Sequence, residues 1–152
     1  MNREILFKAK RKNWRKLPKE EWWVEGNLIT NEREEGTAYI GYIFDVHNGV
    51  IEDFDIVEIA PETLCQYIGK NDEKGNQICE HDVISINTYS YTEPEEDFYG
   101  EVVYAEGWAC WCIQQPGEER PIPLCECEGS YLTKISIMGD AIDNPELLGG
   151  AE

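Results

Sequence analysis

Apolar and polar residues alternate with a period of two along much of this chain. The segment from Val83 to Ser90 is the clearest case, because its apolar residues Ile84 and Ile86 alternate with polar ones. Successive side chains of a β-strand point to opposite faces, so this period predicts a strand. The sequence contains no stretch of 11 residues with a sustained helical apolar stripe. The pattern therefore predicts a mainly β fold.

Turn residues separate the expected strands. Asn48-Gly49 accepts positive φ at both central positions of a tight turn, which is a strong hairpin signal. We expect Thr37–Phe44 and Phe54–Ile59 to form this hairpin, with a turn longer than two residues because Val50–Asp53 alternates less regularly. Further strands are expected at Phe98–Ala105, Trp108–Ile113, Ile122–Cys127 and Tyr131–Met138. The turns between them are expected at Glu106-Gly107, over Gln114–Pro121 and around Gly129. Polar or acidic loops are expected over Asp72–Asn76 and Thr92–Asp97.

Two short helical turns interrupt this β pattern. Pro61-Glu62-Thr63 is expected to open one, and Pro145-Glu146 another, with Asp143 or Asn144 as its cap. The segment Lys12–Glu21 reads as a linker or loop tip, and Trp22 and Trp23 are expected to anchor the next stretch of chain in the core. Strands spaced about 8–12 residues apart, with turns between them, predict a barrel or a sandwich.

Charge is distributed unevenly along the chain. The net charge is −18, from 13 basic and 31 acidic side chains. Residues 1–19 hold eight basic residues and one acid, whereas the rest holds five basic residues and 30 acids. Such a basic segment is expected to meet an anion, which is nucleic acid, the acidic body of the same protein or a neighbouring copy. The candidate residues are Lys8, Lys10, Arg11, Lys12, Arg15 and Lys16.

Simpler interpretations of the charge are favoured. The basic segment reads as an edge strand with solvated cations on its outer face. The dense carboxylates of the body can imitate the phosphate backbone of DNA, but high net charge also serves solubility alone. Membrane binding is not expected, because the longest apolar run, Trp108 to Ile113, is six residues long and a spanning helix needs about 20.

Cysteine and histidine are the only candidates for metal chemistry. Two Cys-x-Cys pairs, each expected on one face of a strand, would allow tetrahedral zinc if their strands were neighbours: Cys110 with Cys112, and Cys125 with Cys127. The favoured interpretation is small core side chains in a reducing cytosol. His47 and His81 lack a third partner at a suitable spacing. We find no motif of a hydrolase, a phosphate-binding loop or a zinc protease, so neither catalysis nor a cofactor is expected.

Four segments are more specific than these signals. They are Arg3 to Ala9, Trp23 to Ile29, Pro61 to Ile84 (with Glu62-Thr63, Gln66-Tyr67, Gly69, Asp72, Gly75, Ile78 and Asp82) and Met138 to Leu148 (with Gly139, Asn144, Pro145, Glu146 and Leu147). In this order they resemble the YopX family of phage and prophage proteins. The main departure is His81, where the family has a glycine that permits positive φ. Ile68, Lys70, Cys79 and Asp140 also depart from the pattern.

The resemblance implies a mainly β fold with a small SH3-like barrel, hairpin extensions and a short C-terminal helical turn. We expect a single unit over residues 1–152, with a sub-boundary near residue 60 that separates hairpins over 1–60 from the barrel over 61–148. The motif residues read as structural. The favoured function is a non-enzymatic interaction module in the host cytoplasm that self-associates, with a host or phage protein as a further candidate partner. The alternatives are a nucleic-acid-linked protein, through the basic segment or by DNA mimicry, and a cysteine-ligated zinc protein.

Overall fold

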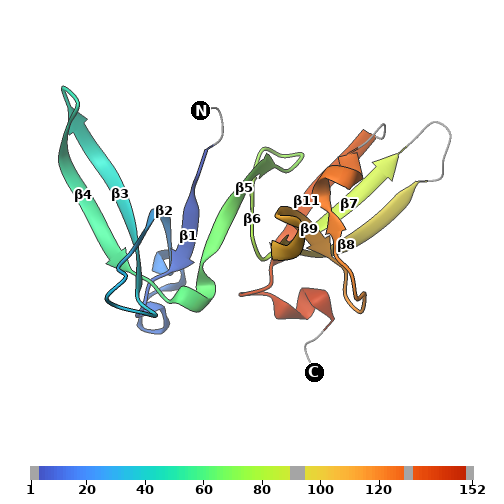
Figure 1. The fold of residues 1–152 in the computed structure, drawn as a ribbon, viewed down its shortest axis with the longest axis horizontal. Coiled ribbons are helices and arrows are strands. Elements are labelled where there is room, and N and C mark those ends of the chain that lie inside the picture. The colour runs from blue at the N-terminus through green and yellow to red at the C-terminus, as the bar shows by residue number, and fades with distance from the viewer. Residues whose placement is uncertain (1–3, 90–94, 129–131, 150–152) are drawn as a thin grey trace. The chain divides into compact units, whose positions relative to one another are not determined.

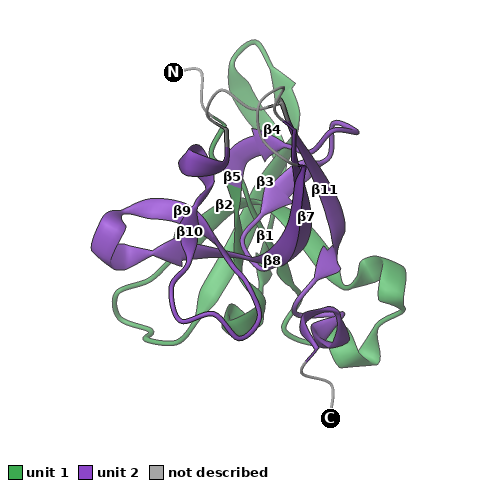
Figure 2. Ribbon diagram, turned by 90° about the vertical axis from the view of Figure 1, so that its right-hand side faces the viewer, with its two compact units in different colours: residues 1–67 green, residues 68–152 purple. Residues whose placement is uncertain are grey.

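Strands dominate the fold, as the period of two predicts. The computed structural model describes residues 4–89, 95–128 and 132–149. Contacts between residues divide the chain into two compact units, residues 1–67 and 68–152 (Figure 2). The division falls after the predicted sub-boundary near residue 60. Within the described ranges, no helix is long and apolar enough to cross a membrane.

Unit 1 is built on an antiparallel sheet. In chain order its strands are β1 (Phe7–Lys10), β2 (Trp23–Thr30), β3 (Ala38–His47), β4 (Val50–Glu58) and β5 (Cys65–Asn71). The sheet order is β4-β3-β2-β1-β5, and β5 continues past residue 67 into unit 2, where β6 (Gln77–Cys79) is its neighbour (Figure 1). The prediction of an edge strand at the basic segment is therefore wrong, because β1 lies between β2 and β5.

The core of unit 1 is small and lies on one face of this sheet. Ala9, Ile40 and Ile59 are almost fully buried at its centre. The predicted turn at Pro61 forms as the 3-10 helix η3 (Pro61–Thr63), in which the Thr63 hydroxyl donates a hydrogen bond to the Ala60 carbonyl over 2.7 Å. The same oxygen accepts the Lys10 amide over 2.8 Å, and this contact joins the turn to β1.

The predicted Asn48-Gly49 hairpin forms between β3 and β4. Asn48 has φ 49° and Gly49 has φ 77°, as the tight turn requires. The expected longer turn is wrong, because Val50 already pairs with His47. The irregular alternation that suggested it comes from two bulges, which leave Phe44 and Glu52 as extra residues in the ladder.

Unit 2 contains a second antiparallel sheet. Its strands are β7 (Asp82–Tyr89), β8 (Glu96–Ala105), β9 (Cys110–Gln114), β10 (Ile122–Pro123) and β11 (Leu132–Asp140), in the order β10-β9-β8-β7-β11. Ile84, Ile86, Val102 and Ile113 are fully buried at the centre of its core. Ile84 and Ile86 thus occupy one face of β7, as the alternation predicted.

Local geometry corrects several predicted boundaries in unit 2. The strand expected from Trp108 starts at Cys110, because Glu106–Trp108 forms the 3-10 helix η4, which Ala109 closes at φ 51°. The strand expected over Ile122–Cys127 ends at Pro123, and Leu124–Glu128 forms the 3-10 helix η5. Ser90, Thr92–Pro94, Gly129 and Tyr131 lie outside the described residues. The described strands form two sheets with no closed barrel, so the SH3-like barrel is not confirmed.

The C-terminal turn forms without the predicted cap. Pro145–Leu148 is the 3-10 helix η6, but no side chain of Asn144 caps it. Leu147 instead packs closely on the end of β11. A Cβ on Gly139 would lie 2.8 Å from Leu147 Cδ1 and 2.9 Å from Asn144 Oδ1, and Gly139 has φ 157°, so another residue there would be strained and would displace these two side chains.

Candidate interaction surface

The β3–β4 hairpin extends beyond the strand that supports it. β2 pairs with β3 only from Thr30↔Ala38 to Asn27↔Gly41. Residues 42–47 and 50–55 therefore form a two-stranded ribbon, which Figure 1 shows reaching past the end of β2. An isolated two-stranded ribbon is marginally stable in water, so this element is suited to being covered by a partner.

One side of this ribbon is apolar. Ile43 pairs with Phe54, Val46 pairs with Ile51, and these pairs project from the same side by strand alternation. Ile56, opposite Gly41, and Ile29 of β2 extend the side toward the base of the sheet. We name these six residues the outer face: Ile29, Ile43, Val46, Ile51, Phe54 and Ile56. Their exposed fractions run from 40% at Ile29 to 59% at Phe54, and five of them line a shallow apolar depression of about 240 Å³.

Acidic residues occupy the other side of the ribbon. Asp53 and Asp55 alternate with Phe54 and therefore project away from the outer face. The Tyr42 hydroxyl donates a hydrogen bond to Asp55 Oδ2 over 3.0 Å, and Asp45 lies directly opposite Asp53. The outer face thus carries no charged side chain at its centre, although the ribbon as a whole is acidic.

The sequence holds a signal for this surface that the alternation analysis did not use. Adjacent apolar residues occur at Ile43-Phe44, Val50-Ile51 and Ile56-Val57. An antiparallel strand with one solvated face has polar residues at every second position. Two adjacent apolar residues therefore place an apolar side chain on each face of the sheet. The side chain on the face away from the core stays exposed to water unless a partner buries it.

Lys10 of the basic segment is buried among tryptophans. Its side chain is 2% exposed, and its Nζ lies 3.9 Å from the ring centre of Trp14, 4.5 Å from that of Trp22 and 5.5 Å from that of Trp23. The Trp22 indole nitrogen donates to the Leu17 carbonyl over 3.0 Å. Lys10 is thus enclosed and does not present its ammonium group to a polyanion.

The other predicted cations surround the same tryptophan cluster. Lys8 lies over Trp23, Arg15 lies over Trp14, and Lys16 is exposed. Arg11 donates to the Glu21 carbonyl over 3.0 Å. Lys12 pairs with Glu58 at the base of β4 over 2.8 Å, and this hydrogen bond raises the pKa of Lys12.

The segment that contains these cations is folded. In place of the linker predicted over Lys12–Glu21, the structure has two 3-10 helices, η1 (Trp14–Lys16) and η2 (Lys19–Glu21). Contact of this segment with nucleic acid stays a prediction.

The four paired cysteines lie near enough to one another for Cys112 to interact electrostatically with the other three. Cys110 and Cys112 Sγ lie 3.7 Å apart, and burial raises the pKa of Cys112 to about 12. Cys125 is exposed on η5, whereas Cys127 is buried in the core, where burial also raises its pKa. Among the described residues, no group of three or more His, Cys, Asp or Glu side chains is arranged to hold a metal ion.

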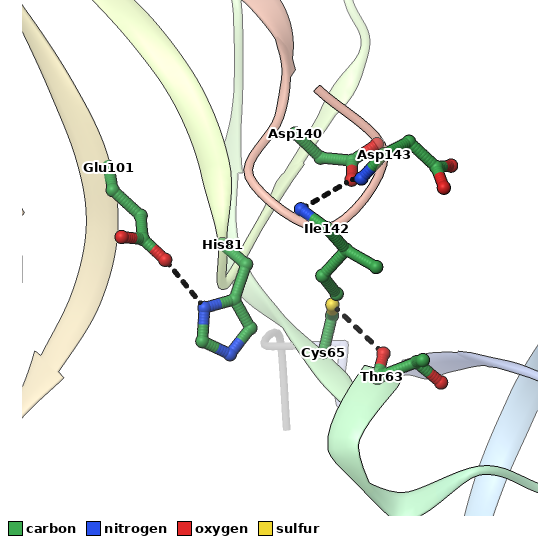
Figure 3. A network of polar contacts seen from close by, with 7 residues as sticks. All are labelled: Thr63, Cys65, His81, Glu101, Asp140, Ile142 and Asp143. Carbon is green, nitrogen blue, oxygen red and sulfur yellow. Dashed lines mark hydrogen bonds and ion pairs between the residues drawn. The ribbon is translucent and has the colours of Figure 1, made fainter. Parts of the chain in front are cut away.

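His81 adopts a left-handed backbone conformation that favours glycine. Its φ is 71°, and its Nδ1 lies 2.8 Å from Glu101 Oε1 (Figure 3). The hydrogen bond to Glu101 raises the pKa of His81, with further contributions from Glu80 and Asp140, against a smaller opposing effect of burial. His47, the other histidine, is exposed at the hairpin tip, opposite Val50.

Figure 3 also shows hydrogen bonds that hold a turn within each unit. The Asp140 carboxylate accepts the Ile142 amide over 3.0 Å and the Asp143 amide over 2.7 Å. In unit 1, the Cys65 thiol donates to the Thr63 carbonyl over 3.3 Å. These contacts hold the backbone of each turn in place.

The remaining family motif residues have structural contacts. Asp72 accepts the Lys74 and Asn76 amides over 3.0 and 2.8 Å, and Gly75 reverses the loop at φ 85°, as predicted. Burial alone would raise the pKa of Asp72, but these hydrogen bonds lower it below its ordinary value. Asp82 accepts the Cys79 amide over 2.8 Å at the start of β7, again as predicted. Of the other motif residues, Ile78 is fully buried and Gly69 has φ 87°. Gln66 of β5 pairs with Phe7 of β1, and the Tyr67 amide donates a hydrogen bond to the Leu6 carbonyl. The exposed motif residues are Glu62, Pro145 and Glu146.

The chain is similar to one solved structure and to one family of proteins. Protein EF1440 from Enterococcus faecalis, known from a crystal structure, is 15% identical, with a TM-score of 0.49 over 95% of this chain and 98% of that one. No curated protein matches the chain. The family model described as YopX protein matches residues 13–149. The chain therefore belongs to the YopX family.

Proposed function

We propose that this protein is a non-enzymatic interaction module, of phage or prophage origin, that acts in the host cytoplasm by associating with copies of itself. The phage setting comes from the family resemblance. The observation that supports association is the outer face of the β3–β4 ribbon. It gathers six large apolar side chains, four of them on the part of the ribbon that β2 does not reach.

The energetics of the ribbon favour a covered state. Large contiguous apolar patches on soluble proteins usually mark interaction sites. The ribbon gains little from its own two strands, and its outer side chains remain about half in contact with water. Burial of these side chains against a partner recovers the hydrophobic free energy that the single chain leaves unused.

Light scattering on the full chain tests the proposal. We expect the mass to rise from that of one 17.5 kDa chain toward a multiple as the concentration increases. Because an apolar contact strengthens when added salt screens the repulsion between acidic copies, association should increase between low and moderate ionic strength. A mass of one chain at all concentrations up to the millimolar range and at each salt concentration would refute self-association.

A further inference from the structure

We propose that two copies pack outer face to outer face in an antiparallel dimer, so that the hairpin tip of each copy lies against the base end of the other. The inference rests on the proposed function and adds how the two outer faces pack and in which relative direction. The tip is the β3–β4 turn with Asp45, Glu52 and Asp53. The base end is the opposite end of the ribbon, where Lys12 pairs with Glu58.

The area and composition of the outer face fit a second copy. Six large side chains at about half exposure amount to roughly 500 Å² of apolar surface, which is at the upper end for one patch on a monomer and more than half of the ~800 Å² that each partner gives to a standard interface. The chain carries a net charge of −18, so most contacts between two copies bring carboxylates together. A centre without charged side chains lets two such copies meet without that repulsion.

Pairing of β4 edges is the main alternative, and its charges oppose it. β4 is the edge strand of the sheet. Two β4 strands paired antiparallel around Phe54 would set Asp53 of one copy opposite Asp55 of the other, and like charges directly opposite destabilise a sheet. The bulge at Glu52 also interrupts the ladder that such pairing needs. Packing of the faces avoids both problems.

Charge along the ribbon selects the direction. Residues 38–57 hold four acids, Asp45, Glu52, Asp53 and Asp55, and no basic residue. The base end is more balanced. Residues 11–21 hold five basic residues and two acids, the loop over 31–37 holds one basic residue and three acids, and Glu58 adds one acid, which gives six basic residues against six acids. Asp45, Asp53 and Asp55 project away from the outer face, so they act through the field of the tip and not by direct contact. Parallel packing would bring two acidic tips near each other, whereas antiparallel packing brings each tip near a base end with cations such as Lys16 and Lys19, both of which are exposed.

A charge swap on the full chain tests the direction. The tip-reversed variant is Asp45→Lys with Asp53→Lys, and the base-reversed variant is Lys16→Glu with Lys19→Glu. The two tip positions face each other in the native ladder, so their joint exchange leaves like charges opposite as before. Circular dichroism confirms that each variant is folded. Native mass spectrometry then counts homodimers and heterodimers in equal mixtures.

The antiparallel dimer predicts a specific pattern. Each variant alone should dimerise about tenfold more weakly than the native chain, because its tips and bases then carry like charge. The mixture of the two variants should form heterodimers about as strongly as the native chain, because every tip again faces an opposite charge.

Two results would overturn the inference. Preferential heterodimers between the tip-reversed variant and the native chain would mean that tips meet tips. Native-like homodimers from both variants would place the contact elsewhere, which leaves self-association intact but refutes this arrangement. A monomeric native chain would refute the proposed function itself.

Discussion

Replacement of Phe54 by serine measures what the outer face contributes to association. The ring is 59% exposed in the single chain. Full burial of a phenylalanine side chain stabilises by roughly 1.5–3 kcal/mol, so the exposed part corresponds to about 1 kcal/mol per copy when a partner covers it. A two-fold dimer contains the residue twice. Phe54→Ser should therefore weaken dimerisation by about 2 kcal/mol, or about 30-fold in Kd.

Sedimentation over a concentration series gives this Kd, and a matched variant gives the control. Trp108 of unit 2 is 53% exposed but lies outside the outer face. Trp108→Ser should leave the Kd within about twofold of native, while it removes a similar amount of exposed aromatic surface. Equal increases in Kd for the two substitutions would show that association depends on exposed apolar surface in general and not on the outer face. An unchanged Kd for Phe54→Ser would refute the assignment of the surface.

Three further predictions concern unit 2. Gly100→Ala should destabilise the fold by about 1–3 kcal/mol, because the new Cβ would lie 2.3 Å from the Gln114 carbonyl oxygen. Gly107→Ala, which has open space around it, should change the free energy of unfolding little. Urea unfolding compares the two variants, and equal midpoints would contradict the close approach of β8 to β9. Iodoacetamide at pH 8 should label exposed Cys125 first and Cys112, with a pKa of about 12, only after unfolding, and peptide mass mapping that finds Cys112 labelled early would contradict its burial. The raised pKa of His81 means that its pair with Glu101 stabilises fully below about pH 6.5 and is lost as the pH rises through the folded-state pKa. The difference in unfolding free energy between the native chain and His81→Gln should accordingly be largest below about pH 6.5 and shrink as the pH rises above it, and a difference independent of pH would exclude the protonated pair.

Local sequence rules predicted the elements whose geometry is decided by a few neighbouring residues. Asn48-Gly49 tolerates positive φ, so two residues were enough to predict the hairpin. Gly75 and the Asp82 carboxylate likewise act within a few positions of themselves. The alternation of Ile84 and Ile86 predicted the buried face of β7 because a single sheet face determines it.

Features that depend on distant partners were not predictable from such rules. Lys10 is buried because Trp14, Trp22 and Trp23 surround it, and charge counting alone treats every lysine as solvated. The strand expected over Ile122–Cys127 stops at Pro123, because proline cannot donate to the ladder and the chain continues as η5. The bulges at Phe44 and Glu52 shift the ribbon's register, and the outer face became visible only once that register was known.

Hydrogen exchange of the native chain tests the central claim without any substitution. Amides of residues 42–56 should exchange more slowly at high protein concentration than at low concentration, because the dimer covers and rigidifies the ribbon. Amides of residues 96–105 in β8 serve as the internal reference and should exchange alike at both concentrations. Equal exchange of the ribbon at both concentrations, in a sample whose mass doubles, would contradict the outer face as the site where two copies meet.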